Sequence, residues 1–295
     1  MANVAFSSLY DEQQRIRPEL LEWVPCNLCG SSRQGVWATK DTWSLVVCAD
    51  CGLVYVNPRL NAEGLRLAYA EDYFTLQSDP EDTRKRYDMY RIEINDLERT
   101  VRGGRIVDVG ANGGDFLAAL GPHWEKCGCE VNDVAVQYAK SQHGLTLQHG
   151  SFRAAGYRTE FFDCVNLRGV IEHLPDPLAE LREAHRVLKR GGVVAINTPN
   201  INSLCARIYR DGFRLVDPRF HIYYFSSQTM SRMLERAGFR VVREAYFYLD
   251  TPYADPLADL KTIVNDLQRM EADPGYRPQS PAFFENVLNI YAEKP

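Results

Sequence analysis

Four cysteines near the start of the chain have the spacing of a metal site, because they form two C-x-x-C pairs with 18 residues between them: Cys26, Cys29, Cys48 and Cys51. Two such turns facing each other supply the four sulfur ligands of a tetrahedral Zn²⁺ ion. Glycine follows each pair, at positions 30 and 52, which suits a turn through positive φ. Four protein sulfurs leave no position for water or substrate, so we expect a structural zinc. The alternative is four reduced structural thiols, which the paired spacing disfavours.

The second candidate site is a glycine-rich turn that follows the apolar run 106–109 and leads into an expected helix. Its residues are Asp108, Gly110, Ala111, Asn112 and Gly114. Small residues let a ligand approach the backbone, and the helix N-terminus offers free amide hydrogens. A dinucleotide-binding G-x-G-x-x-G turn would stand at the same place, but positions 112 and 115 are Asn and Asp, so its later glycines are absent. Asn112 can still adopt positive φ.

Residues at the ends of the next two expected strands fit an adenosine. Glu130 lies twenty positions beyond Gly110, where a carboxylate accepts hydrogen bonds from both hydroxyls of a ribose, and Val131 stands beside it. Ser151 and Phe152 offer a hydroxyl and a ring to an adenine. Each residue taken singly has an ordinary structural reading, but together they indicate an adenosine-containing ligand.

Two histidines are candidates for a general base. His173 follows the strand expected at 162–167, and Glu172 beside it could orient the imidazole or cap the next helix. His221 lies in the long segment 199–226, among aromatic and basic residues that could close over a pocket. The structural alternatives are that Glu172 and His173 tie their loop together by hydrogen bonds, and that the aromatic neighbours of His221 pack as core.

The elements that must position these residues alternate along the chain. After a helical period at 87–97, the sequence predicts helices near 115–120, 133–141, 177–188 and 227–237, and strands at 106–109, 126–131, 145–149, 162–167, 192–198 and 239–247. This alternation predicts an α/β fold with a mostly parallel sheet and helices on both faces, whose ligands bind at the carboxyl ends of the strands. Segments 36–37 and 43–47 predict a short hairpin between the cysteine pairs.

The composition excludes several classes of protein. The 34 Lys and Arg residues against 39 Asp and Glu give a net charge of −5, which offers polyanions no attractive field and disfavours a nucleic-acid partner. No apolar stretch approaches the roughly 20 residues of a membrane span. The start of the sequence lacks the basic-then-apolar order of a signal peptide, so we expect a cytoplasmic protein.

Taken together, these motifs resemble the class I S-adenosylmethionine-dependent methyltransferases. The most specific part is segment 163–177, with Val170-Ile-Glu172-His173 before Asp-Pro, followed by a helix that ends in Leu188-Lys-Arg-Gly-Gly192. Segments 221–226, 234–239 and 292–295 resemble the tail of one subgroup, and 48–59 resembles the end of the zinc knuckle that this subgroup often carries. Its members commonly methylate sugars, glycan intermediates or secondary metabolites.

The resemblance implies a Rossmann-like, seven-stranded sheet with S-adenosylmethionine as cofactor and a small-molecule acceptor, such as a nucleotide sugar or glycan intermediate. It implies three regions: a zinc knuckle at 1–60, a helical linker at 61–100 and a methyltransferase domain at 101–295, with an acceptor cap at 199–226. The proline-rich stretch 251–282 indicates an insertion before the last strand, with an expected helix near 256–271 beside the acceptor pocket. The resemblance also implies that the turn residues hold the methionine part, Glu130 the ribose, and Ser151 and Phe152 the adenine, while Arg168 lines the same pocket.

Three other functions fit parts of the sequence. A nucleic-acid methyltransferase would use the knuckle as a reader, but segment 23–59 has basic residues only at positions 33, 40 and 59. A nicotinamide-dependent oxidoreductase would need the dinucleotide glycines that are absent. A non-catalytic binding module would use the knuckle and the aromatic segment as a partner surface. The sequence leaves the acceptor, the methylated atom type and the oligomeric state open.

Overall fold

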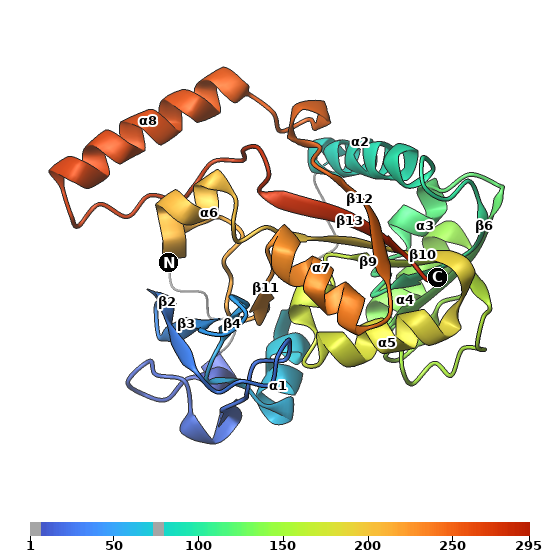
Figure 1. Ribbon diagram of the computed structural model, residues 1–295, viewed down its shortest axis with the longest axis horizontal. Coiled ribbons are helices and arrows are strands. Elements are labelled where there is room, and N and C mark those ends of the chain that lie inside the picture. Colours follow the sequence, from blue (N-terminus) through green and yellow to red (C-terminus); the bar gives the residue numbers. More distant parts are fainter. Residues whose placement is uncertain (1–6, 73–79) are drawn as a thin grey trace.

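The apolar runs from residue 104 onward form one seven-stranded sheet in the computed structural model, which describes residues 7–72 and 80–295 (Figure 1). The strand order is β12-β13-β10-β9-β6-β7-β8, and β13 runs antiparallel to both of its neighbours. This confirms the Rossmann-like, mostly parallel sheet. The strands are β6 (Gly104–Val109), β7 (Trp124–Glu130), β8 (Gln148–His149), β9 (Phe162–Arg168), β10 (Leu188–Pro199), β12 (Arg240–Ala245) and β13 (Val287–Glu293).

Helices cover both faces of the sheet because successive strand residues point to opposite sides. Ile106 of β6 packs into a core with Tyr90, Ile94 and Phe116, whereas Val107 packs into a second core with residues of the helices on the other face. The first face carries α2 (Pro80–Leu97), α3 (Asp115–Ala119) and α4 (Asp133–His143); the second carries α5 (Pro177–Val187) and α7 (Ser227–Arg236). The expected three-layer arrangement is therefore present.

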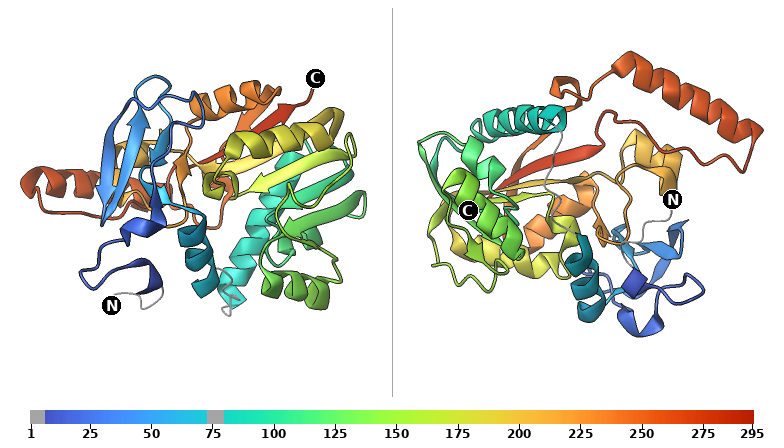
Figure 2. Two further views of the ribbon diagram at one scale, coloured as in Figure 1. Left: turned by 90° about the horizontal axis from the view of Figure 1, so that it is seen from below. Right: turned by 180° about the vertical axis from the view of Figure 1, so that it is seen from behind.

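The N-terminal region forms a second sheet whose strand order is β11-β4-β3-β2. The expected hairpin is its core, formed by β2 (Gln34–Lys40) and β3 (Trp43–Cys48). β4 (Val54–Val56) extends it, and β11 (Tyr223–Tyr224) joins from the segment expected to be a cap. The residues Tyr223, Tyr224 and Phe225 are fully buried, so the aromatic stretch there is core. Figure 2 shows this sheet beside the larger one.

The remaining elements lie around these two sheets. β1 (Leu21–Glu22) pairs with β5 (Arg59–Leu60), and α1 (Ala62–Asp72) follows directly. α6 (Leu204–Tyr209) lies within segment 199–226. No helix in the described ranges is both long and apolar enough to span a bilayer. The start of the chain, on which the signal-peptide argument rests, lies outside the described residues up to position 6.

The predicted helix in the insertion exists as α8 (Pro256–Ala272), and none of its residues lines the cavity at the carboxyl ends of the strands. The helix extends along the periphery of the molecule, away from the carboxyl ends of β6 and β7 (Figures 1 and 2). Only Ile263 and Asp266 of α8 are buried. Tyr209 of α6 and Tyr276, which follows α8, both donate hydrogen bonds to the Asp266 carboxylate, and the bond from Tyr209 holds the helix against α6.

A buried carboxylate fixes α2 against the sheet. Asp96 accepts hydrogen bonds from Arg243 of β12, at 2.8 Å for Nη1 and 2.6 Å for Nη2, and from the Tyr291 hydroxyl of β13 at 2.7 Å. Asp96 is 4% exposed, and Arg243 also lies over the Tyr291 ring at 4.2 Å. One acidic side chain thus joins a helix to two strands.

Replacing Asp96 with alanine is expected to lower the free energy of unfolding by about 2–4 kcal/mol, because Arg243 and Tyr291 would lose their shared acceptor. Urea denaturation measures the loss. The control is D88A on the same helix, where the Asp88 side chain is 45% exposed and faces Arg91 at 3.8 Å; its expected loss is below about 0.5 kcal/mol. Equal losses for both variants would contradict this role of Asp96.

Candidate active site

A cavity of about 560 Å³ opens at the carboxyl ends of β6, β7, β8 and β9. Ten of the residues singled out from the sequence line it: Asp108, Gly110, Ala111, Asn112, Glu130, Val131, Ser151, Phe152, Arg168 and His173. Three more of the candidates, Gly114, Glu172 and His221, do not. The parallel sheet accounts for this convergence, since it brings the ends of its strands to one edge.

Backbone conformation explains the glycine-rich turn. Gly110 has a φ of +66°, and a Cβ there would lie 2.8 Å from Cγ2 of Val170, so a side chain would be strained and would collide with the loop after β9. Asn112 has a φ of +51°, as expected, and its Oδ1 accepts a hydrogen bond from the Gly113 amide at 2.7 Å. The turn therefore presents backbone rather than side chains to the cavity.

The sequence placed Gly114 in the binding turn. In the structure it does not line the cavity and instead marks the start of α3. It precedes α3 with a φ of +78°, and a Cβ there would lie 2.9 Å from Cδ1 of Leu145. Glycine is needed at this position so that the chain can enter the helix and pack closely against α4 and the residues after it.

Glu130 ends β7 as a buried carboxylate held by two backbone amides. Its Oε2 accepts from Asn112 N–H at 2.9 Å, and its Oε1 accepts from Asn132 N–H at 2.9 Å. An ionised carboxylate has about four acceptor positions, so acceptor capacity remains after these two bonds. The side chain is 4% exposed and borders the cavity, where it can accept hydrogen bonds from a pair of ligand hydroxyls.

Asp108 lies deeper, at the end of β6. Burial raises the pKa of Asp108 to about 7, and the carboxylates of Glu130 and Glu93 act in the same direction. The amide of Asn166, which donates to Oδ1 at 2.7 Å, and the charge of Arg168 oppose this shift. The group can therefore accept a hydrogen bond from, or donate one to, a polar ligand at neutral pH.

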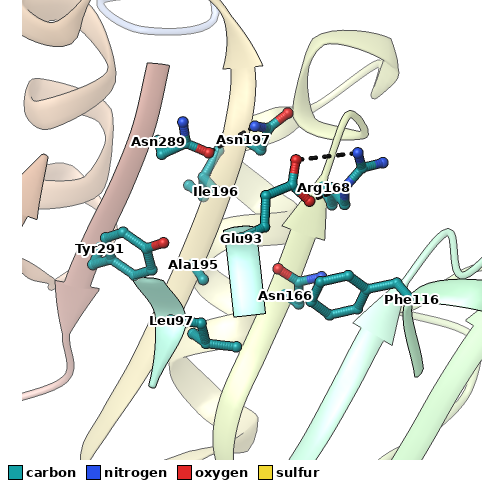
Figure 3. A pocket seen from close by; sticks show the side chains of 10 residues that line it. All are labelled: Glu93, Leu97, Phe116, Asn166, Arg168, Ala195, Ile196, Asn197, Asn289 and Tyr291. Atoms are coloured by element: carbon teal, nitrogen blue, oxygen red, sulfur yellow. Dashed lines mark hydrogen bonds and ion pairs between the residues drawn. The ribbon is translucent and has the colours of Figure 1, made fainter. Parts of the chain in front are cut away.

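Arg168 is held by a partner that the sequence did not reveal. Figure 3 shows its guanidinium beside the Glu93 carboxylate of α2; Nη2 donates to Oε1 at 3.1 Å, and Nε donates to Oε2. Burial alone would lower the pKa of Arg168, but Glu93 outweighs it, so the pKa lies above its usual range. The guanidinium also lies 4.9 Å from the centre of the Tyr90 ring. The arginine is thus fixed and largely neutralised at the cavity wall.

The two candidate histidines lie edge to face, with ring centres 4.7 Å apart. His221 does not face the cavity; its Nδ1–H donates to the Leu215 carbonyl at 2.9 Å. Burial and the neighbouring His221 ring lower the pKa of His173 to about 3, although the Phe220 backbone and Asp217 act the other way. His173 is therefore neutral above about pH 5, and it is the member of the pair that borders the cavity.

Glu172 supports this loop from behind. Its Oε2 accepts from the Thr198 hydroxyl at 3.0 Å, its backbone carbonyl accepts from Ile222 N–H at 2.9 Å, and burial raises its pKa. The candidate ligand atoms of Glu172, His173 and His221 all lie within 4.8 Å of one another. Protein hydrogen bonds from Thr198 and to Leu215 occupy two members of this group.

The four N-terminal cysteines converge. The Sγ atoms of Cys26 and Cys51 are 3.4 Å apart, those of Cys29 and Cys48 are 3.5 Å apart, and all four lie within 4.8 Å of one another. Gly30 and Gly52 have φ values of +78° and +79°, as the sequence predicted for the turns after each pair. This sulfur set has the composition that a tetrahedral zinc ion requires.

Two residues of the N-terminal region contact the cavity wall, and sequence reasoning missed both. Asn27, between the first two cysteines, accepts from Leu178 N–H at 3.1 Å and donates to Asp176 at 2.9 Å, so it caps α5 from outside. Arg59 donates to the Pro175 carbonyl at 2.8 Å and to the Tyr223 hydroxyl at 3.0 Å. Since Pro175 lines the cavity, the knuckle holds one of its walls in place.

Comparison with solved structures agrees with the fold. A methyltransferase of Thermotoga maritima, described as S-adenosylmethionine-dependent and possibly a histamine N-methyltransferase, superposes with a TM-score of 0.50 at 21% identity, covering 72% of this chain and 91% of that one. An S-adenosylmethionine-dependent methyltransferase of Archaeoglobus fulgidus gives a TM-score of 0.50 at 19% identity over 73% of this chain and all of the other. These likenesses concern the fold alone.

Curated relatives match part of the sequence. The ubiquinone biosynthesis O-methyltransferase of Ruegeria pomeroyi is 34% identical over 113 residues, which are 36% of this chain and 45% of that relative. The demethylmenaquinone methyltransferase of Staphylococcus aureus is 27% identical over 173 residues, with 50% of this chain and 72% of the relative covered. The chain thus spans less than half of the first relative and about seven tenths of the second.

A family model described as a methyltransferase domain matches residues 83–244, which is more than half of the chain. The match runs from within α2 to within β12 and contains every residue named above that borders the cavity from the sheet. The chain therefore belongs to this methyltransferase family.

Proposed function

We propose that the enzyme methylates a hydroxyl-bearing small molecule of the sugar or glycan-intermediate class, bound in the cavity beside the cofactor. The observation that carries the cofactor site is Glu130, a buried carboxylate that two backbone amides aim along the cavity. The resemblance of the knuckle and the C-terminal motifs supports the acceptor class. A screen with nucleotide sugars, glycan intermediates and phenolic quinone precursors tests it, and turnover of only the phenols would exclude the proposed class.

The residues present fit S-adenosylmethionine, which when bound supplies a methyl group on a positively charged sulfur, activated for in-line displacement. Glu130 would accept hydrogen bonds from the ribose hydroxyls, and the turn at 110–112 would present its backbone to the methionine part. Asp108 and Arg168 would bind polar groups of that part, and Phe152 would pack against the adenine. These assignments follow the positions of the residues around the cavity.

His173 is the side chain that we propose takes a proton from the acceptor. It is neutral at physiological pH and borders the cavity, and the His221 ring packs against it edge to face. A pKa of about 3 also makes it a weak base. Alignment of the acceptor by the cavity walls would then supply most of the acceleration, because a near-attack geometry can contribute about 7–11 kcal/mol.

We also propose that the cysteine cluster holds one structural Zn²⁺ ion. The four sulfurs fill its coordination sphere, so the metal would act only through the shape of the knuckle. Asn27 and Arg59 connect the knuckle by hydrogen bonds to α5 and to Pro175. These contacts support a role for the metal in stabilising the cavity wall.

The first prediction from the proposed function concerns Glu130. We expect E130A to weaken the binding of S-adenosylhomocysteine by about 10- to 100-fold, because two hydrogen bonds to a charged group would be lost. Isothermal titration calorimetry measures the affinity. The control is E125A on the same strand, where Glu125 is exposed and pairs with Arg105 outside the cavity. Unchanged affinity in E130A would contradict the proposed ribose site.

The second prediction concerns the metal. We expect about one zinc ion per chain, and we expect C48S to lower the melting temperature by about 5 °C or more because the knuckle would lose its cross-link. The control is C127S, since Cys127 lies in β7 outside the cluster. Loss of turnover on zinc removal without any change in melting temperature would indicate a catalytic metal instead.

The third prediction follows from the low pKa of His173. Below pH 6.5 the unfolded chain takes up a proton on this histidine that the folded chain does not, so folding stability falls as the pH falls. The difference in unfolding free energy between wild type and H173N should therefore shrink by up to about 1.4 kcal/mol per pH unit between pH 6 and pH 4. Asp108 and Glu180, whose raised pKa values act in the opposite direction, cancel in this difference.

Chemical denaturation at several pH values measures this difference. At pH 8 it gives the packing cost of the substitution alone and serves as the internal reference. A difference that does not change with pH would show that His173 titrates normally and is not enclosed as described.

A further inference from the structure

The side chain of Glu180 borders the cavity from the first turn of α5. Its Oε2 atom is enclosed, and it has no hydrogen-bond partner within the parts of the chain that the structure describes. Folded proteins pair nearly all buried polar atoms, so an unpaired carboxyl oxygen at the wall of a binding cavity indicates a partner supplied by the ligand.

The surroundings of Glu180 place it at the end of the cavity that holds Ser151 and Phe152. Burial raises the pKa of Glu180 to about 7; Arg153, which directly follows Phe152, lowers it, and Glu183 and Asp176 raise it. Glu180 also acts electrostatically on Cys129, the residue before Glu130. Glu180 therefore lines the same cavity as Ser151 and Phe152, within electrostatic range of the end of β7 and of the loop that carries Arg153.

Ser151 already uses part of its acceptor capacity within its own loop. Its Oγ accepts a hydrogen bond from Ala154 N–H at 3.3 Å. The Ser151 hydroxyl can still donate to a ring nitrogen. Ser151 keeps a second acceptor position, whereas the enclosed Oε2 atom of Glu180 accepts no hydrogen bond from the described residues and so has the greater need of a donor.

We propose that Glu180 binds the exocyclic amino group of the cofactor's adenine and makes the site selective for adenine over bases that carry an oxygen there. The inference rests on the proposed cofactor site. A carboxylate oxygen accepts a hydrogen bond from the amino group of adenine. If the base carries a carbonyl oxygen instead of the amino group, two hydrogen-bond acceptors face each other and no hydrogen bond forms. Such a mismatch leaves both groups unpaired, which is an effective basis for rejection.

The test compares two ligands that differ only at that group. S-adenosylhomocysteine carries the amino group, and S-inosylhomocysteine carries an oxygen in its place. Their dissociation constants are measured at pH 8 for the wild type, E180A, E180Q and a control, E183A. Glu183 lies on the same helix, forms an ion pair with Arg186 and does not line the cavity.

In the wild type and in E183A we expect about 100-fold preference for the adenosyl ligand. In E180A that ligand should bind about 10-fold more weakly, because the acceptor is gone. In E180Q the adenosyl ligand should keep its affinity to within about 5-fold, while the inosyl ligand gains about 10-fold, because the amide can turn and donate to the oxygen.

Three results would overturn the inference. Unchanged affinity and selectivity in both Glu180 variants would show that this carboxyl group does not contact the adenine, while the proposed cofactor site would stand. Failure of the wild type to bind S-adenosylhomocysteine would remove the cofactor site and the inference with it. If E180A does not fold, as judged by its melting temperature, the isosteric E180Q decides: an unchanged preference there contradicts the proposal.

Discussion

The hydrogen bonds from two backbone amides to Glu130 are the constraint on which the rest of the site depends. They join the turn after β6 to the turn after β7, so the ends of two adjacent strands become one rigid surface. The bond from Asn112 requires that residue to adopt its positive φ, and the approach of Val170 requires glycine at position 110. The geometry of the cavity follows from these local backbone demands.

A second constraint joins the N-terminal region to this surface. The sheet that carries the cysteine cluster is completed by β11, which comes from the segment between β10 and α7. Its buried cysteines and Leu53 belong to the same core as Val165 and Leu181 of the large sheet and α5. The knuckle is therefore not an independent module, and Arg59 and Asn27 connect it to the loop at 173–178. A change in the structure of the knuckle would therefore displace these contacts at the wall of the cavity.

The strands and helices of the large sheet could be predicted because their apolar periodicity is strong and local. The pairing of Tyr223 and Tyr224 with Val54 and Tyr55 could not, since a two-residue strand is stabilised only by a partner distant in sequence. The same reason applies to Glu93, Asn27, Arg59 and Glu180, which carry no local signal and acquire their roles from tertiary contacts. A glycine that starts a helix, as Gly114 does, and one that contacts a ligand look alike in sequence, so the sequence pattern could not separate the two roles.

The charged groups of the cavity are already arranged before any ligand binds. Asp108 and Glu180 both have raised pKa values because they are buried, and the charge of Arg168 is already engaged by Glu93. Buried carboxyl groups with unused acceptor capacity lower the stability of the protein alone, and a ligand that donates hydrogen bonds to them recovers part of that loss. Because these groups lie along one cavity, a single extended donor such as a nucleoside with an amino-acid tail can satisfy them together. The cavity therefore selects a ligand whose hydrogen-bond donors match the spacing of these acceptors. The parallel sheet sets that spacing, because it brings the ends of its strands to one edge.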